Sequence, residues 1–104
     1  MEHNLSPMSE TAYYILLSLL EERHGYGIMQ YVAGITANRI NIGAGTIYGT
    51  LGKLEKSKMI TTTRDEEKRK YYQITEEGIK MLEAEIKRLE ELYSNGREAL
   101  SHGK

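Results

Sequence analysis

The stretch from residue 44 to residue 75, AGTIYGTLGKLEKSKMITTTRDEEKRKYYQIT, decides the fold class of this 104-residue chain. In its first half, Ile47, Leu51 and Leu54 recur at helical spacing. This stripe predicts a helix over about residues 44–57 with one buried face.

The second half of the stretch predicts a β-hairpin. Residues 60–64 and 69–75 are rich in β-branched and aromatic side chains that alternate with polar ones, and the polar residues 65–68 separate the two runs. Tyr72 shares a strand face with Ile74, so we expect Tyr72 in the core.

A first helix is expected upstream, over about residues 8–22. Its apolar side chains fall on one face, Ser6-Pro7 precedes them as a start signal, and His24-Gly25 follows as a stop.

A second, shorter apolar stripe predicts another helix over about residues 26–36. Ile40 and Ile42 then alternate with polar residues, which predicts a very short strand before the helix at 44–57.

The last predicted helix begins after Thr75, a residue suited to cap it, with Glu76 and Glu77 favourably placed in its first turn. The apolar pattern continues to at least Tyr93. Residues 94–96, Ser-Asn-Gly, indicate a stop, with a frayed tail beyond.

Three helices, a hairpin and a final helix form the element order of a winged helix-turn-helix domain, in which the third helix enters the major groove of DNA. The expected fold class is therefore mainly α (α+β). We expect residues 1–75 to form the winged helix-turn-helix domain and residues 76–104 to add a C-terminal dimerisation helix and tail to the same compact unit.

The final helix carries an apolar seam spaced like two coiled-coil heptads. Helix 8–22 also has more apolar residues than one face can bury, among them Tyr13, Tyr14 and Leu17. Both features favour a homodimer built on these two helices, and the alternative is that the last helix packs only on its own domain. The seam consists of Ile79, Leu82, Ile86, Leu89 and Tyr93.

The charge distribution favours a polyanionic partner on one side of the molecule. The formal net charge is only −1, but residues 36–75 carry eight basic and four acidic residues, whereas residues 1–35 carry one and four and residues 76–104 five and seven. A basic middle segment suits DNA, although a solvated surface of mixed charge would give the same count.

The outward face of helix 44–57 is nearly bare. Gly49 and Gly52 lie inside the helix, where each costs roughly 1 kcal/mol relative to alanine. Close approach to a DNA groove would explain them, and the alternative is a neighbouring helix of the same protein. The face comprises Gly45, Gly49, Gly52, Lys53 and Lys56, flanked by Thr46 and Tyr48.

The hairpin, or wing, supplies further basic residues. Lys68, Arg69 and Lys70 form the densest basic run of the chain, and Arg64 lies on the opposite strand. The adjacent acids at 65–67 would repel DNA, so contact is expected from the flank of the wing and not from its tip. A mixed-charge edge that merely keeps the hairpin soluble is the alternative for any single residue.

Other function classes find little support. The chain has no cysteine, and its histidines His3, His24 and His102 are scattered, so neither a metal site nor an enzyme is expected. No cofactor is implied. No apolar run approaches the roughly 20 residues that span a bilayer, and the start lacks a signal peptide, so we expect a cytoplasmic protein without a membrane partner.

Four motifs occur in a specific order over about residues 9–92: Tyr14-Ile15-Leu16-Leu17 with Leu19-Leu20-Glu21-Glu22; Gly25-Tyr26-Gly27-Ile28; Gly45-Thr46-Ile47-Tyr48 with Leu51 and Leu54; and Arg69-Lys70-Tyr71-Tyr72 running to Thr75-Glu76-Glu77-Gly78. Together they resemble the PadR family of transcriptional regulators. The resemblance implies a dimeric winged-helix repressor that reads the major groove with its third helix and often responds to flat aromatic or phenolic compounds.

The expected function is therefore a DNA-binding transcriptional repressor that binds double-stranded operator DNA as a homodimer and is relieved by a small aromatic effector. The alternative is a winged-helix protein-interaction module that does not bind DNA. An aromatic effector would stack on Tyr13, Tyr14 or Tyr93, because the chain lacks tryptophan and phenylalanine. The expected DNA contacts are Thr46, Tyr48, Gly49, Lys53, Arg64, Lys68, Arg69 and Lys70.

Overall fold

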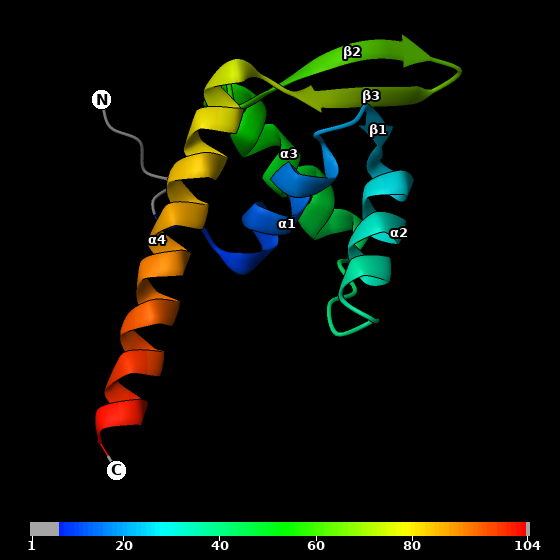
Figure 1. Cartoon of the computed structure of the whole chain (residues 1–104). Helices are drawn as coiled ribbons and strands as arrows, with labels where there is room; N and C mark the ends of the chain where they lie inside the picture. Colours follow the sequence, from blue (N-terminus) through cyan, green and yellow to red (C-terminus); the bar gives the residue numbers. More distant parts are fainter. Residues whose placement is uncertain (1–6, 104) are drawn as a thin grey trace.

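The computed structural model describes residues 7–103, which form a winged helix-turn-helix body with one long projecting helix (Figure 1). The elements in chain order are α1 (Glu10–Ser18), β1 (Arg23–His24), α2 (Gly25–Ile35), α3 (Ala44–Lys56), β2 (Ile60–Glu66), β3 (Arg69–Ile74) and α4 (Glu76–His102).

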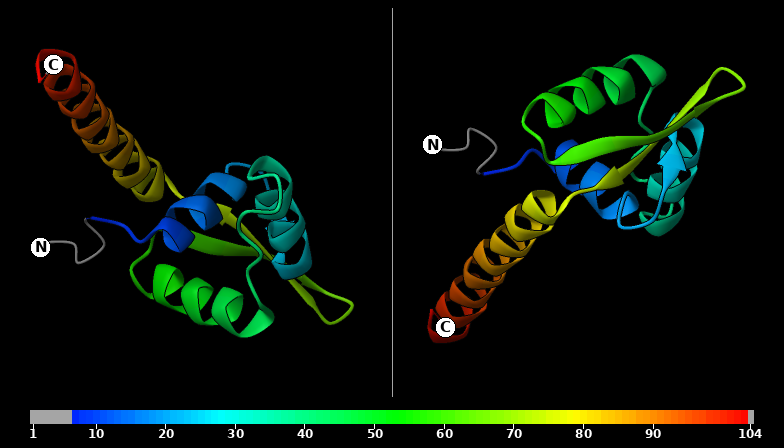
Figure 2. Two further views of the ribbon diagram at one scale, coloured as in Figure 1. Left: turned by 90° about the horizontal axis from the view of Figure 1, so that it is seen from below. Right: turned by 90° about the horizontal axis from the view of Figure 1, so that it is seen from above.

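Helices α1, α2 and α3 pack around one apolar core that the sheet closes on one side, while most of α4 extends away from the body (Figure 2). The sheet is antiparallel, with strand order β1-β3-β2. Apolar side chains buried to 2% exposure or less come from all three helices of the body and from the segments around them: Ile15, Leu16, Leu19, Ile28, Val32, Ile47, Leu51, Leu54, Met59 and Ile60.

Helix α1 is shorter than the predicted range of 8–22. It begins after Ser9, whose side chain accepts a hydrogen bond of 3.0 Å from the amide of Ala12. It ends at Ser18, whose hydroxyl donates to the carbonyl of Ile15 at 2.6 Å. Met8 and Leu19 are buried outside the helix, so the apolar spacing overestimated its length.

The short strand predicted at Ile40 and Ile42 is wrong, because both residues lie in the α2–α3 connection without strand structure. Ile42 is buried in the core and Ile40 packs against it partly buried, which accounts for their alternation with polar residues. The strand that the prediction missed is β1, whose Arg23 and His24 pair with β3. Two residues are too few to show an alternating pattern.

The hairpin is confirmed, with a tighter turn than expected. Glu66 pairs with Arg69, so Glu67 and Lys68 alone form the turn, with φ values of 50° and 66°. Positive φ at both central residues is typical of the hairpin turns whose twist matches that of the strands. The predicted tip at 65–68 was therefore too wide. Tyr72 is buried at 5% exposure, as predicted.

Helix α4 continues to His102, so the stop predicted at Ser94-Asn95-Gly96 is wrong. A lone glycine weakens a helix by about 1 kcal/mol without ending it, and no proline follows to force a break. The apolar seam consequently gains a further exposed position at Leu100.

The start of α4 is fastened to the turn between α3 and β2. The amide of Thr75 donates to the carbonyl of Met59 at 2.9 Å, and the Thr75 hydroxyl lies 2.8 Å from the carbonyl of Lys58. The same hydroxyl oxygen caps the helix by accepting from the amide of Gly78 at 3.0 Å. Gly78 itself leaves no room for a side chain, because a Cβ there would lie 2.2 Å from the Met59 carbonyl oxygen.

We predict opposite effects of alanine at Gly78 and at Gly52. Gly78→Ala should lower the free energy of unfolding by roughly 1–3 kcal/mol or more, because its methyl group meets backbone that cannot move aside. Gly52→Ala should raise it by up to about 1 kcal/mol, because that site is open and helical. Urea unfolding of both variants at one protein concentration measures the difference. Equal effects would contradict the close packing at Gly78.

Candidate nucleic-acid interface

Helix α3 has one fully buried face and one nearly bare face. Ile47, Leu51 and Leu54 are at most 1% exposed and anchor the helix in the core. The opposite side presents glycines flanked by exposed Thr46 and Lys53. The buried stripe keeps the helix in place, so the outer face can remain without large side chains.

The glycines of α3 face open space. A Cβ built at Gly45, Gly49 or Gly52 would have no atom of another part of the chain within 4 Å. The alternative that they admit a neighbouring helix of the same chain is therefore wrong for the described residues. Their effect is to leave a smooth surface to which an external partner can come close.

Tyr48 is the aromatic side chain at the border of this face, and the outer end of its ring lies against the start of α2. A Cβ at Gly25, the first residue of α2, would be 2.3 Å from the Tyr48 hydroxyl oxygen and 2.7 Å from Cζ. Tyr48 nevertheless remains 54% exposed. Its position thus depends on the absence of a side chain at Gly25.

Between the wing and the helix-turn-helix lies a hollow of about 310 Å³ that combines basic and aromatic groups. Sequence reasoning assigned no role to one of its residues, Tyr26, although that side chain is 58% exposed. The Gly25-Tyr26-Gly27 motif could have indicated a role for Tyr26, because it places a large aromatic side chain between two glycines. The lining residues are His24, Tyr26, Tyr48, Lys68, Arg69, Lys70 and Tyr72.

Arg64 differs from Lys68, Arg69 and Lys70 of the wing, because it forms ion pairs with two carboxylates of the same chain. Its guanidinium lies 3.3 Å from a carboxylate oxygen of Glu22 and 3.0 Å from one of Glu66. It also stacks 3.9 Å above the ring centroid of Tyr71. A hydrogen bond from Thr63, together with Arg64, lowers the pKa of the Glu22 carboxyl. The charge of Arg64 is therefore already compensated at the base of the wing.

His24 joins the wing to α2 as a neutral ring. Its Nδ1 accepts a hydrogen bond of 3.2 Å from the amide of Gly27 and so caps α2. Burial, and then the charge of Arg69, lower the pKa of His24, and both effects favour the neutral form that the cap requires. Because Nδ1 accepts a hydrogen bond, the proton of the neutral ring is on Nε2. The Arg69 guanidinium lies 3.2 Å from Nε2, but a protonated Nε2 cannot accept a hydrogen bond from it.

A second hollow, of about 300 Å³, lies between α1 and α4. Tyr13 and Tyr14 meet there edge to face, with ring centroids 5.5 Å apart. Glu85, only 4% exposed, accepts two hydrogen bonds from Arg88, and this pairing lowers the pKa of the Glu85 carboxyl. Tyr93 is 69% exposed and does not line the hollow, so within one chain it is separated from the other two predicted effector residues.

The predicted dimer seam on α4 is exposed except at one position. Ile79, Ile86, Leu89 and Tyr93 are 36%, 44%, 37% and 69% exposed. Leu82 was predicted to lie in the dimer interface. It is 4% exposed and belongs to the core of its own chain, so it offers almost no surface to a second chain. Leu17, on α1, is half-buried against the same core.

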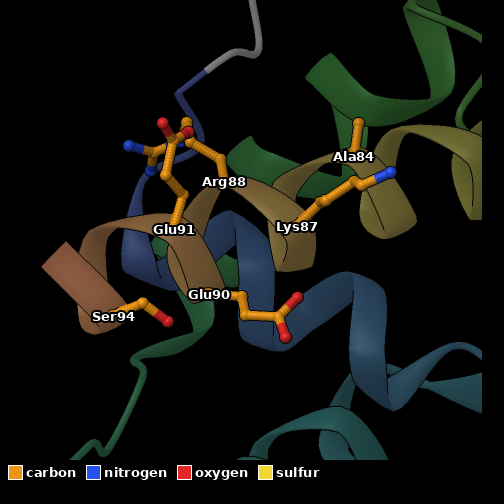
Figure 3. A pocket seen from close by; sticks show the side chains of 6 residues that line it. All are labelled: Ala84, Lys87, Arg88, Glu90, Glu91 and Ser94. Carbon is orange, nitrogen blue, oxygen red and sulfur yellow. The ribbon is translucent and has the colours of Figure 1, made fainter.

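The flank of α4 also forms a third, open hollow of about 570 Å³, and every residue lining it belongs to α4 (Figure 3). Such a hollow has only one wall. Its lining residues are Ala84, Lys87, Arg88, Glu90, Glu91 and Ser94.

Other kinds of site are not found in the part of the chain that the structure describes. Residues 7–103 contain no cluster of histidine and carboxylate side chains arranged to hold a metal ion. Among these residues, no helix has the length and apolar character needed to cross a bilayer.

Comparison with known proteins identifies the family of the chain. Residues 9–84 match the model of the transcriptional regulator PadR-like family. The chain belongs to this family. Its winged-helix architecture and its resemblance to PadR regulators, both expected from the sequence, are thereby confirmed.

Three relatives illustrate the match. A PadR-like transcriptional regulator from Bacillus cereus superimposes with a TM-score of 0.70 at 26% identity, covering 92% of this chain and 94% of that one. A transcriptional regulator from Clostridium thermocellum gives 0.72 at 26% identity, covering 86% and 90%. An uncharacterized protein of Lysinibacillus sphaericus is 35% identical over 92 residues, covering 79% of this chain and 84% of its own.

Proposed function

We propose that this PadR-like regulator is a cytoplasmic repressor that binds operator DNA as a homodimer. The observation that carries the proposal is the bare face of α3, whose glycines meet nothing within 4 Å while the opposite face is fully buried. A helix surface without side chains can enter the major groove deeply, and Thr46, Tyr48 and Lys53 at its edges then reach phosphates and base edges.

The wing would add contacts along the phosphate backbone. Lys68, Arg69 and Lys70 border the hollow beside Tyr48, so they face the same side as the recognition helix α3. Arg64 would contribute less than these three, because Glu22 and Glu66 already neutralise it. In a dimer, two such surfaces would span half-sites about 34 Å apart, one turn of DNA.

We predict that Gly49→Glu abolishes binding while the protein keeps its fold and oligomeric state. The carboxylate adds bulk and like charge on the groove-facing side without touching the buried stripe. The matched control is Gly34→Glu, which makes the same change at an open glycine of α2. Gel shifts with the DNA upstream of the protein's own gene measure the effect. Normal affinity of Gly49→Glu would favour the alternative, a winged-helix module that binds protein.

A second copy of the chain is the proposed partner of α4. Apart from Leu82, the apolar residues of the seam are exposed from Ile79 to Leu100, and every residue that lines the hollow along the flank of α4 belongs to α4. Helices with an unpaired heptad seam are stabilised by pairing. Twofold pairing of α1 and α4 across two chains would cover the exposed seam and the hollow along the flank of α4. It would also set the distance between the recognition helices of the two chains.

We predict that Ile86→Lys weakens dimerisation by roughly 100-fold or more. A twofold interface loses the buried side chain twice, at about 1.5–3 kcal/mol each. The matched control is Ile35→Lys, because Ile35 is 49% exposed at the end of α2, away from the seam. Sedimentation equilibrium measures both variants. An intact dimer with Ile86→Lys, or equal effects of the two substitutions, would contradict the role of the seam.

A flat aromatic or phenolic effector is proposed to bind in the hollow between α1 and α4. The hollow offers aromatic faces from Tyr13 and Tyr14 and polar anchors from Glu85 and Arg88. A ligand there would contact the proposed dimer helix, so it would relieve repression if it preferred a different spacing of the recognition helices.

Tyr14→Ala is expected to raise the effector concentration needed to release DNA by about tenfold, while DNA affinity without effector changes less than twofold. The reason is that Tyr14 lines the hollow and lies away from α3. Titrating a panel of flat phenolic compounds against the DNA complex gives both values. A larger loss of DNA affinity than of effector response would refute this site.

A further inference from the structure

Gly25 and Tyr48 bring α2 and α3, the two helices of the helix-turn-helix, into close contact. A methyl group at Gly25 would lie 2.3 Å from Oη, 2.7 Å from Cζ and 3.1 Å from Cε1 of Tyr48. A real Cβ atom essentially never comes within 3.0 Å of another heavy atom, so an alanine at this position displaces the ring.

The displaced group would be a side chain and not the backbone. The three nearest atoms all belong to the outer end of the Tyr48 ring, and this side chain is 54% exposed, so it has solvent to move into. Gly78 is different, because there a Cβ meets the backbone of Met59. A substitution at Gly25 therefore changes the position of Tyr48 and leaves the fold in place.

The surroundings of the Tyr48 hydroxyl suit an anionic oxygen. Tyr48 lines the hollow that also holds Lys68, Arg69 and Lys70, and no carboxylate is among the residues that line it. Asp65 and Glu66 lie in β2, and Glu66 is paired with Arg64. A hydroxyl in a hollow that three basic side chains also line donates favourably to a phosphate oxygen.

We propose that Gly25 is a positioning residue for DNA binding: by lacking a side chain it holds the Tyr48 hydroxyl in this basic hollow, where it donates a hydrogen bond to one backbone phosphate. This inference rests on the proposed function and adds to it a specific contact and the residue that prepares that contact. Because every sequence offers a phosphate at this place, the contact contributes to affinity without discriminating between sequences.

The test compares Gly25→Ala, Tyr48→Phe and the double variant, with Gly27→Ala as the matched control. A Cβ at Gly27 has its nearest neighbour at 3.8 Å, an ordinary contact two residues along the same helix. Each single variant at positions 25 and 48 should lose about tenfold in affinity, the loss typical of a hydrogen bond to a charged group. The double variant should lose no more than either single one. Thermal midpoints should stay near that of the wild type, and Gly27→Ala should bind normally.

The binding data also distinguish failure of the phosphate contact, failure of the positioning role and failure of the proposed function. The losses should be equal on operator and unrelated duplexes; a loss confined to the operator would overturn the phosphate contact in favour of base reading. Additive losses in the double variant would overturn the positioning role. If Gly25→Ala and Tyr48→Phe bind normally while Gly49→Glu does not, this inference fails and the proposed function stands.

The last readout needs no DNA. The ring resonances of Tyr48 in the free protein should shift in Gly25→Ala and stay unchanged in Gly27→Ala. Unchanged Tyr48 resonances in Gly25→Ala would overturn the proposal even if the wild-type protein bound no duplex, an outcome that would separately refute the proposed function.

Discussion

The close fit of Gly78 against the backbone of Met59 determines how the two ends of this molecule are related. Met59 ends the turn after α3 and begins the wing, and its carbonyl accepts the amide of Thr75 at the start of α4. Because no side chain separates these segments, the backbone of the α3–β2 turn lies directly against the first turn of α4. The close contact of Gly78 with Met59 therefore fixes the start of α4 against the turn that joins α3 to the wing.

The glycines that leave the outer face of α3 bare also lower the intrinsic stability of this helix. Each interior glycine costs roughly 1 kcal/mol relative to alanine, and α3 holds two of them in 13 residues. The buried side chains of Ile47, Leu51 and Leu54 offset this cost, at about 1.5–3 kcal/mol each. Stability thus comes from one face, and the other is free to be shaped for contact, an arrangement typical of functional surfaces.

The sequence predicts an element correctly where its apolar pattern extends over several residues. The stripe of α3, the hairpin and the burial of Tyr72 followed from spacing alone, because one register buries all their apolar side chains. Sequence patterns do not predict β1, because its two residues pair only with a distant strand, nor the end of α4, because the helix continues through Gly96. The bare face of α3 was predicted in advance. The compensation of Arg64 by Glu22, 42 positions apart, was not, since sequence separation hides such contacts.

The most direct test of the account is to map the contact surface by adding an operator duplex to isotope-labelled protein and recording backbone amide shifts. If α3 enters the major groove, the largest changes fall on Gly45, Gly49 and Gly52 of α3 and on residues 68–70 of the wing, and the amides of the α2 C-terminal turn stay unchanged. Changes concentrated on α4, or absent from the α3 glycines at saturating duplex, would contradict it.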